Sequence, residues 1–163
     1  MKVTPGERIG EEMNAVSDQN QDLTSTIHLT SLRSVQGPVQ ELLAKSDPEV
    51  LRVLNQLDEE SAMLVALIGP NRGARFLLNE NSTSIGRATD ADIFLDDVTV
   101  SRKHCIIEKS DNAGKRIFKL KDSGSLNGSY INGALVADAL LSDGDEVQVG
   151  KFRMHFFSGG KSR

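Results

Sequence analysis

The sequence predicts an all-β fold, either a sandwich or a barrel, over most of its length. From Met63 on, short apolar runs are separated by turn residues such as "GPNRG", "SDNAG" and "SDGD". About ten such runs in succession are typical of this fold class. The run "RIFKLK" alternates with period two, so Phe118 and Leu120 share one strand face and Ile117 lies on the other. No strand–helix–strand alternation appears, which argues against a parallel nucleotide-binding sheet.

Residues 1–37 are expected to form a disordered tail. Polar residues dominate this segment and its apolar residues follow no sustained period, so it buries too little surface to offset the entropy of ordering. Within it, "DLTSTIHLTSL" mixes hydroxyl residues with Leu and Ile. This mixture is typical of a docking peptide, and a plain Ser/Thr-rich linker is the alternative.

Residues 38–61 are expected to form a helical linker segment. Asp47 is a suitable N-cap and Pro48 suits the first helical position, which predicts a helix over 48–60. Four apolar residues follow the spacing i, i+3, i+4, i+7 of one helix face: Val50, Val53, Leu54 and Leu57. The helix either packs on the domain behind it or binds a partner, and "PVQELLAK" predicts a shorter helix before it.

The expected strands occupy residues 62–158. In chain order they are "AMLVALIG", "ARFLL", "TSIG", "DIFL", "HCIIEK", "RIFKLK", "SYING", "ALV", "DEVQVG" and "FRMHFF". Residues 159–163 are expected to be a flexible C-terminus.

Composition excludes several classes of function. The 163 residues carry a net charge of −4, whereas nucleic-acid binders usually show a basic excess. No apolar run reaches the length of a membrane span, and "MKVTPGERIGEEMNAVSDQN" lacks the apolar region of a secretory signal. A cytoplasmic location is therefore expected. Cys105 is the single cysteine, which excludes an internal disulfide and a cysteine-based metal site.

The sequence gives little support for a catalytic site or a metal site. Ser101 and His104 are three residues apart, but the sequence offers neither a nucleophile elbow nor an evident oxyanion hole. His28, His104 and His155 are scattered along the chain. The acidic "DGDE" is too short for a calcium loop and predicts a tight turn. No catalytic residue, metal or cofactor is expected.

A phosphate-binding site is the stronger hypothesis. Arg87 follows a predicted strand, Ser101 and Arg102 stand on a loop, and Asn127 stands on another. Guanidinium, hydroxyl and amide groups are suitable donors for phosphate oxygens. Each residue is a weak signal alone, because a lone surface arginine is usually solvated and a lone Asn-Gly is usually a turn.

Taken together and in this order, the motifs resemble the forkhead-associated (FHA) domain. Gly86-Arg87, Ser101-x-x-His104 and "DSGSLNGS" match its spaced motifs, and "SDGD" with "VQVGKFRMHFF" fits its last hairpins. The resemblance covers about residues 62–158. It implies an eleven-stranded β-sandwich that binds phosphothreonine peptides on loops at one end.

The resemblance also implies roles for the polar residues. Arg87 matches the arginine that contacts the phosphothreonine and the peptide backbone. Ser101 matches the phosphate-binding serine, and Arg102 stands at the neighbouring phosphate-contacting position. Asn127 matches the asparagine that holds the peptide backbone beyond the phosphothreonine.

Other matched positions are structural. His104 resembles the histidine that braces the binding loops, and Gly86 and Gly128 match backbone requirements. Leu126 departs from the pattern, since many relatives carry Thr there. A hydroxyl that helps to select the phosphothreonine is therefore missing.

One group of short actinobacterial FHA proteins, which regulate glycogen accumulation or inhibit oxoglutarate dehydrogenase, is more similar still. In that group, Ser/Thr kinases phosphorylate tail threonines, and the tail then binds its own domain. The unmodified form regulates enzymes including oxoglutarate dehydrogenase and glutamate dehydrogenase. The tail here keeps one matching acceptor, Thr24, with Ile27 three residues later, and Thr26 is the second candidate. A flexible chain from Thr24 to Met63 spans about 34 Å, and tethering gives an effective concentration on the order of millimolar.

The main hypothesis is thus a non-enzymatic phosphothreonine-binding regulator that tail phosphorylation switches. The alternatives are an adaptor that recruits other phosphoproteins without self-inhibition, and a partner protein that docks through the helix at 48–60. Neither nucleic acid nor membrane is an expected partner.

Overall fold

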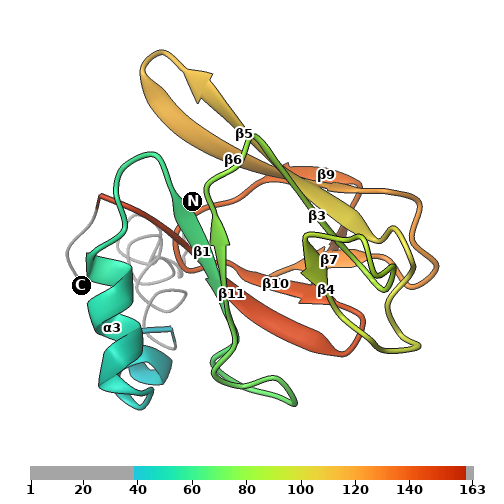
Figure 1. Cartoon of the computed structure of the whole chain (residues 1–163), viewed down its shortest axis with the longest axis horizontal. Coiled ribbons are helices and arrows are strands. Elements are labelled where there is room, and N and C mark those ends of the chain that lie inside the picture. Colours follow the sequence, from blue (N-terminus) through green and yellow to red (C-terminus); the bar gives the residue numbers. More distant parts are fainter. Residues whose placement is uncertain (1–38, 161–163) are drawn as a thin grey trace, which may run out of the picture. The chain divides into compact units, whose positions relative to one another are not determined.

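The computed structural model describes residues 39–160, which contain eleven strands in two sheets (Figure 1). The strands and helix α3 (Pro48–Asn55) belong to one compact unit that begins at Leu43. The six-stranded sheet consists, in spatial order, of β2 (Arg75–Leu78), β1 (Ala62–Val65), β11 (Phe152–Ser158), β10 (Glu146–Val149), β7 (Ser129–Ile131) and β8 (Ala134–Val136). The five-stranded sheet consists of β4 (Ile93–Phe94), β3 (Ser82–Gly86), β5 (Cys105–Asn112), β6 (Lys115–Asp122) and β9 (Asp138–Leu140). The expected all-β class and its eleven strands are confirmed.

Most neighbouring strands pair antiparallel, and β3 and β4 pair parallel. The hairpin of β5 and β6 has the longest register, from Cys105 opposite Asp122 to Asn112 opposite Lys115. The sequence pattern predicted ten of the strands and missed β9, a three-residue strand that pairs with β6. Its residues are partly exposed, so they leave no apolar run.

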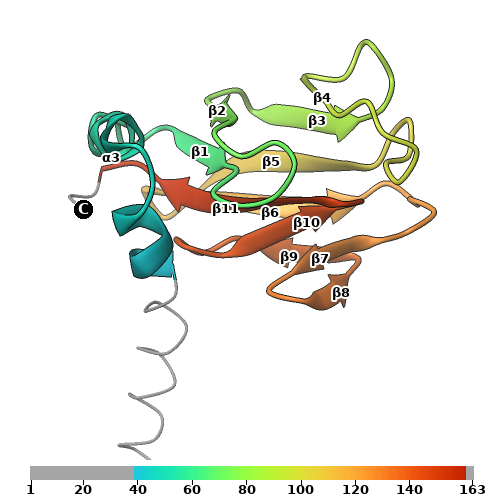
Figure 2. The same cartoon turned by 90° about the horizontal axis from the view of Figure 1, so that it is seen from below.

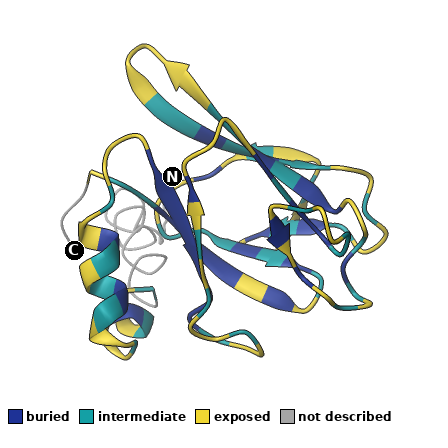
Figure 3. Ribbon diagram, in the orientation of Figure 1, coloured by how far each residue is buried: buried dark blue, intermediate teal, exposed yellow. Residues whose placement is uncertain are grey.

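The core lies between the two sheets. Along β6 the burial alternates, with Phe118 and Leu120 buried as the period-two pattern predicted. The Phe118 ring meets Phe156 of β11 in the other sheet, with centroids 5.4 Å apart and planes tilted by 59°. Figure 3 shows the buried residues in the middle of the strands and the exposed ones at the tip of the β5–β6 hairpin.

Helix α3 (Pro48–Asn55) precedes the sandwich and is shorter than predicted. The Asp47 side chain caps it by accepting a hydrogen bond from the Glu49 N–H at 3.0 Å. After Asn55 the chain turns, and a backbone carbonyl of this turn accepts a hydrogen bond from the segment that follows β11. Gly160 N–H donates to the Leu57 carbonyl at 3.0 Å, which ties the end of β11 to the helix. Residues 39–44 form the shorter preceding helix.

The outer face of the six-stranded sheet is also covered. Strand alternation turns four buried residues of β1 and β11 away from the central core: Met63, Val65, His155 and Phe157. Helix α3 buries Val50 and Leu54, and Figures 1 and 2 both place it beside the end of β1 and β11. The helix therefore packs on the domain behind it.

Three loops lie together at the other end of the sandwich from α3 (Figure 2). The first loop follows β3, the second joins β4 to β5, and the third joins β6 to β7. The strand register brings their starting points together, because Ile85 pairs with Cys105 and Cys105 pairs with Asp122. The expected tail at 1–37 and residues 161–163 lie outside the described residues.

Candidate phosphate-binding site

The three loops bring together the four predicted phosphate-contacting residues. Arg87 follows β3, Ser101 and Arg102 belong to the β4–β5 loop, and Asn127 belongs to the β6–β7 loop. Arg102 and Asn127 are exposed, while Arg87 and Ser101 are half-buried. The two phosphorylation candidates, Thr24 and Thr26, lie outside the described residues.

The first two loops are joined through their backbones. Arg87 N–H donates to the Ser101 carbonyl at 2.9 Å, and Ala88 N–H donates to the Arg102 carbonyl at 3.1 Å. This approach requires glycine at position 86, because a Cβ atom there would overlap the Arg102 carbonyl oxygen. Gly86 thus allows the two loops to lie in direct contact.

The side chains of Arg87 and Ser101 are each fixed by one hydrogen bond and keep further N–H or O–H donors without a partner in the described part of the chain. Arg87 Nε donates to the Val100 carbonyl at 3.1 Å, and its two terminal nitrogens have no partner among residues 39–160. Ser101 Oγ accepts a hydrogen bond from the Leu126 N–H at 2.9 Å. Because this oxygen acts as an acceptor there, its own O–H proton remains to be donated to a ligand.

His104 braces the loops from inside. Its side chain is fully buried, and Nδ1 accepts a hydrogen bond from the Ser101 N–H at 3.0 Å. A backbone N–H can only donate, so Nδ1 carries no proton and Nε2 donates to the Gly128 carbonyl at 2.9 Å. Neither nitrogen meets the Ser101 hydroxyl, so the pair does not have the geometry of a nucleophile and its base.

Asn127 is positioned by Thr99, a residue that the sequence reading missed. Asn127 Nδ2 donates to the Thr99 carbonyl at 3.0 Å, which links the β6–β7 loop to the β4–β5 loop. Thr99 in turn donates through N and Oγ1 to Asp97 Oδ1, at 2.9 and 2.6 Å. Lys151 Nζ lies 2.6 Å from Asp97 Oδ2. Hydrogen bonds from Lys151 and Thr99 lower the pKa of Asp97 to about 2.

The signal for this arrangement was the Asp-x-Thr spacing of Asp97 and Thr99, which is typical of a side chain that bonds its own backbone two residues on. Its distant partner Lys151 stands in the turn between β10 and β11 and leaves no local trace in the sequence.

Asp122 organises the β6–β7 loop. Its carboxylate accepts hydrogen bonds from the N–H groups of Gly124 and Ser125, each at 2.9 Å, and from the hydroxyls of Ser125 and Ser129, at 2.5 and 2.7 Å. Burial opposes ionisation, but the hydrogen bonds from Ser125 and Ser129 outweigh it and lower the pKa of Asp122. Gly128, at φ 83°, then makes the left-handed turn that returns the chain to β7.

Two exposed apolar residues neighbour the polar ones in the sequence. Val98 and Leu126 are each 89% exposed, and they flank Thr99 and Asn127, which are joined by a hydrogen bond. Leu126, which the family resemblance marks as a missing hydroxyl, is also a highly exposed apolar side chain. Both side chains offer apolar surface next to polar groups.

The arrangement suits binding of an anionic group without chemistry. The three loops carry two guanidinium groups, one hydroxyl and one amide, and donors of these kinds match a phosphate. Within the described part of the chain, no group of three potential ligands is arranged to hold a metal ion. No described helix is long and apolar enough to cross a membrane.

Comparison with known proteins identifies a family. The FHA domain model matches residues 83–150. The glycogen accumulation regulator GarA of Mycolicibacterium smegmatis is 42% identical over 156 residues, which cover 93% of this chain and 94% of that protein. The oxoglutarate dehydrogenase inhibitor of Corynebacterium jeikeium is 49% identical over 105 residues, covering 64% of this chain and 70% of that protein.

Solved structures of FHA domains are also similar to this chain. One described as an analysis of phosphothreonine-dependent FHA domain interactions superposes with a TM-score of 0.54 at 32% identity, covering 62% of this chain and 99% of that one. Another, of the FhaA FHA domain in complex with an intracellular domain, gives a TM-score of 0.50 at 31% identity, covering 59% of this chain and 98% of that one. The curated relatives are named as regulators and inhibitors rather than as enzymes.

Proposed function

Because the chain belongs to the family of FHA domain proteins that includes the mycobacterial glycogen accumulation regulators, we propose that it is a cytoplasmic regulator that binds phosphothreonine peptides. Like those relatives, it is a regulatory protein and not an enzyme. A phosphothreonine carries about −1.5 to −2 charge and three acceptor oxygens. The ligand class follows from the match between this group and the donors on the three loops.

One observation carries the proposal. Ser101 is held twice, through its N–H to His104 in its own loop and through its Oγ from Leu126 in the β6–β7 loop, so the hydroxyl oxygen is positioned while its proton remains to be donated. Arg87 is held through Nε to the carbonyl of Val100, the residue before Ser101, and its terminal nitrogens have no partner among the described residues. Donors arranged before the ligand arrives bind more tightly, because little ordering remains to be done.

The switch that we propose uses the chain's own tail. A Ser/Thr kinase phosphorylates Thr24, with Thr26 as the second candidate, and the phosphothreonine then occupies Arg87, Ser101, Arg102 and Asn127. Tethering supplies an effective concentration on the order of millimolar, so even a modest affinity closes the molecule. The unphosphorylated form leaves the surface open.

The partners that we propose for the open form are metabolic enzymes. Relatives are named oxoglutarate dehydrogenase inhibitors, which makes oxoglutarate dehydrogenase the first enzyme to test and glutamate dehydrogenase the second. The exposed Val98 and Leu126 beside the phosphate-binding residues supply apolar contact area for a folded partner.

The experiment has two parts. First, isothermal titration of the full chain with a phosphothreonine peptide is expected to give saturable binding, which the unphosphorylated peptide lacks. Charge-assisted hydrogen bonds contribute about 1.5–3 kcal/mol each, so Arg87→Ala is expected to weaken binding at least about tenfold. Arg153→Ala, on the outer face of β11, is the matched control.

Second, the chain is phosphorylated with a bacterial Ser/Thr kinase and the modified site is mapped. NMR resonances around Arg87, Ser101 and Asn127 are expected to move, and Arg87→Ala is expected to abolish that movement. If phosphorylation of the tail leaves these resonances in place while added phosphopeptides still bind, the self-binding switch is wrong and the simple adaptor stands.

A further inference from the structure

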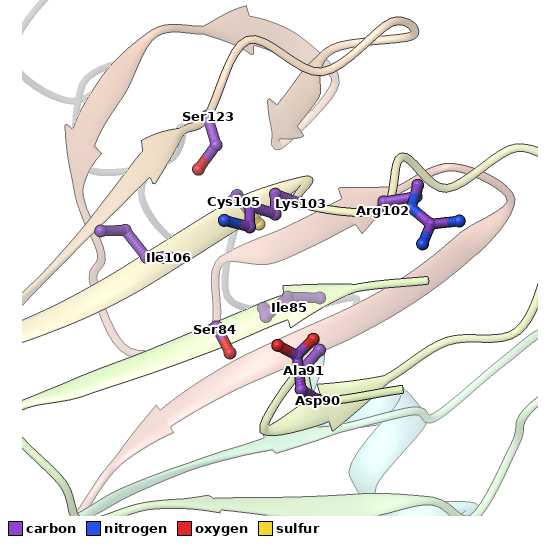
Figure 4. A pocket seen from close by; sticks show the side chains of 9 residues that line it. All are labelled: Ser84, Ile85, Asp90, Ala91, Arg102, Lys103, Cys105, Ile106 and Ser123. Atoms are coloured by element: carbon purple, nitrogen blue, oxygen red, sulfur yellow. The ribbon is translucent and has the colours of Figure 1, made fainter. Parts of the chain in front are cut away.

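A pocket of about 140 Å³ lies beside the phosphate-binding loops (Figure 4). Ser84 and Ile106 face each other across β3 and β5, and alternation turns them to the outer face of the sheet, opposite the core residues Ile85 and Ile107. Ala91 belongs to the loop after β3. Ile106 and Ala91 therefore supply apolar lining, while the Ser84 hydroxyl in the same lining is occupied by its hydrogen bond to Asp92 at 3.1 Å.

The pocket adjoins the phosphate-binding residues through Arg102. Arg102 belongs to the pocket lining and follows Ser101 directly in the β4–β5 loop. At the other end of the same short stretch, Thr99 accepts the hydrogen bond from Asn127. The loop thus runs from Asn127, past Ser101, to the pocket, and the phosphate-binding serine lies between the two ends.

This order gives the pocket a place along a bound peptide. The FHA match assigns Asn127 to the peptide backbone that follows the phosphothreonine. Residues that precede the phosphothreonine must then leave on the opposite side of Ser101, toward Arg102 and the pocket.

We propose that this pocket binds the aliphatic residue immediately before the phosphothreonine, and that in this chain the occupant is Leu23 of the tail. The inference rests on the proposed phosphothreonine binding and adds a subsite to it. A cavity of about 150 Å³ accepts a benzene molecule, so the volume here suffices for the isobutyl group of leucine.

Charges at the rim fit the same segment. Lys103 is exposed at the pocket and neighbours Arg102, while Asp90 lines the opposite wall. The tail carries Asp22 just before Leu23, and a lysine side chain is long enough to meet a carboxylate outside the pocket while its stem lies along the apolar surface. The subsite therefore favours an acidic residue followed by an aliphatic one before the phosphothreonine.

The test uses the full unphosphorylated chain and a synthetic peptide of residues 18–30 phosphorylated at Thr24, with fluorescence anisotropy as the readout. Leu23→Ala in the peptide is expected to weaken binding about tenfold, because most of a buried leucine side chain is lost. Leu29→Ala, the same change on the other side of the phosphothreonine, is expected to alter affinity less than about twofold.

Variants of the domain localise the effect. Ala91→Leu fills the pocket, so it is expected to weaken the Leu23 peptide but not the Leu23→Ala peptide, which is the signature of direct coupling. Ala134→Leu, on exposed β8, is the matched control. Lys103→Met is expected to weaken the peptide with Asp22 more than the peptide with Asp22→Ala, with Lys115→Met at the hairpin tip as control.

The outcomes separate the two proposals. Equal, saturable binding of the Leu23 and Leu23→Ala peptides overturns the subsite and leaves phosphothreonine binding intact. Equal weakening of both peptides by Ala91→Leu also overturns it. Absence of binding by every phosphopeptide removes the proposed function and the subsite together. Should Ala91→Leu fail to fold by circular dichroism, the peptide pair alone decides.

Discussion

At the scale of single residues, His104 and Gly86 hold the binding loops in one arrangement. The imidazole joins Ser101 to Gly128 through its two nitrogens. Gly86 lets the β3 end lie against the Arg102 carbonyl. Loss of either contact is expected to loosen one loop from the others, although neither residue is expected to contact a ligand.

Gly86→Ala is expected to destabilise the fold by about 2–3 kcal/mol, because the added methyl group overlaps backbone that cannot rotate away. The matched control is Gly114→Ala in the β5–β6 turn, where φ is 81° and the space is open. There only backbone strain acts, at about 1 kcal/mol. Urea unfolding measures both, and equal losses would contradict the steric explanation.

Cys105 is expected to be chemically inert in the folded protein. The side chain is 1% exposed, and burial raises the pKa of its thiol to about 12. Thiolate is the reactive form, so iodoacetamide at pH 8 should label the chain only after denaturant is added. Ser110→Cys, at an exposed position of β5, should label at once. Rapid labelling of the native wild type would refute the prediction.

At the scale of elements, the β5–β6 hairpin anchors the chain that leaves helix α3. Lys109 Nζ donates to the carbonyls of Glu60 and Asn79, at 3.1 and 2.9 Å. Arg116 contacts Glu60 and also lies 2.6 Å from Asp111. The segment before β1, the turn after β2 and the hairpin are thus connected by two cations.

The β11 strand introduces a dependence of stability on pH. His155 is 4% exposed, and its Nδ1 has no hydrogen-bond partner among the described residues. Burial lowers the pKa of His155 below its usual 6.5, although Glu146 on the neighbouring strand opposes this shift. The unfolded state therefore binds the proton more readily.

The sign follows from the lowered pKa. Stability from His155 is fully present above pH 6.5 and is lost as the pH falls through the folded pKa. The free energy of unfolding should decrease between pH 7 and pH 5, as measured by urea titration. His155→Leu should flatten that decrease, and an unchanged slope in this variant would contradict the assignment.

Strands with strong patterns were predictable from the sequence, and weak ones were not. β6 alternates clearly, so its faces were assigned correctly, whereas β9 is a short edge strand whose residues are partly exposed. Helix α3 ends at Asn55 rather than at residue 60, because the following residues turn toward β1. The local sequence pattern cannot predict this end of the helix, because tertiary contacts override the helix propensity of the residues that follow.

The candidate site could likewise be predicted only in part from the sequence. The donor chemistry of Arg87, Ser101 and Asn127 was readable from residue type and from the family resemblance. Their convergence depends on the strand register, and the support from Lys151 crosses 52 residues to reach Thr99. Interactions of that separation leave no periodicity in the sequence, so only the structure reveals them.

At the scale of the whole molecule, the loops and helix α3 lie at opposite ends of the sandwich (Figure 2). The tail joins the domain through the helical segment, so a self-bound phosphothreonine requires a linker long enough to reach the loops. The part of the chain between Thr24 and the helix at 39–44 sets that reach, so the length of this linker is the variable to change.

Phosphorylation of Thr24 is expected to weaken binding of an added phosphothreonine peptide about 100-fold when the free peptide binds near 10 μM, since the tethered tail competes at about millimolar concentration. Deleting residues 31–38 should restore part of the affinity by shortening the linker. Anisotropy titration of both phosphorylated forms measures this, with Thr24→Ala as the unswitched control. Identical affinities before and after phosphorylation would rule out closure.

Val98 and Leu126 keep 89% of their surface in water, so folding does not depend on their identity. Randomising these two codons would vary partner preference on an unchanged framework. That separation makes the domain a practical starting point for laboratory evolution of reagents that recognise phosphorylated epitopes.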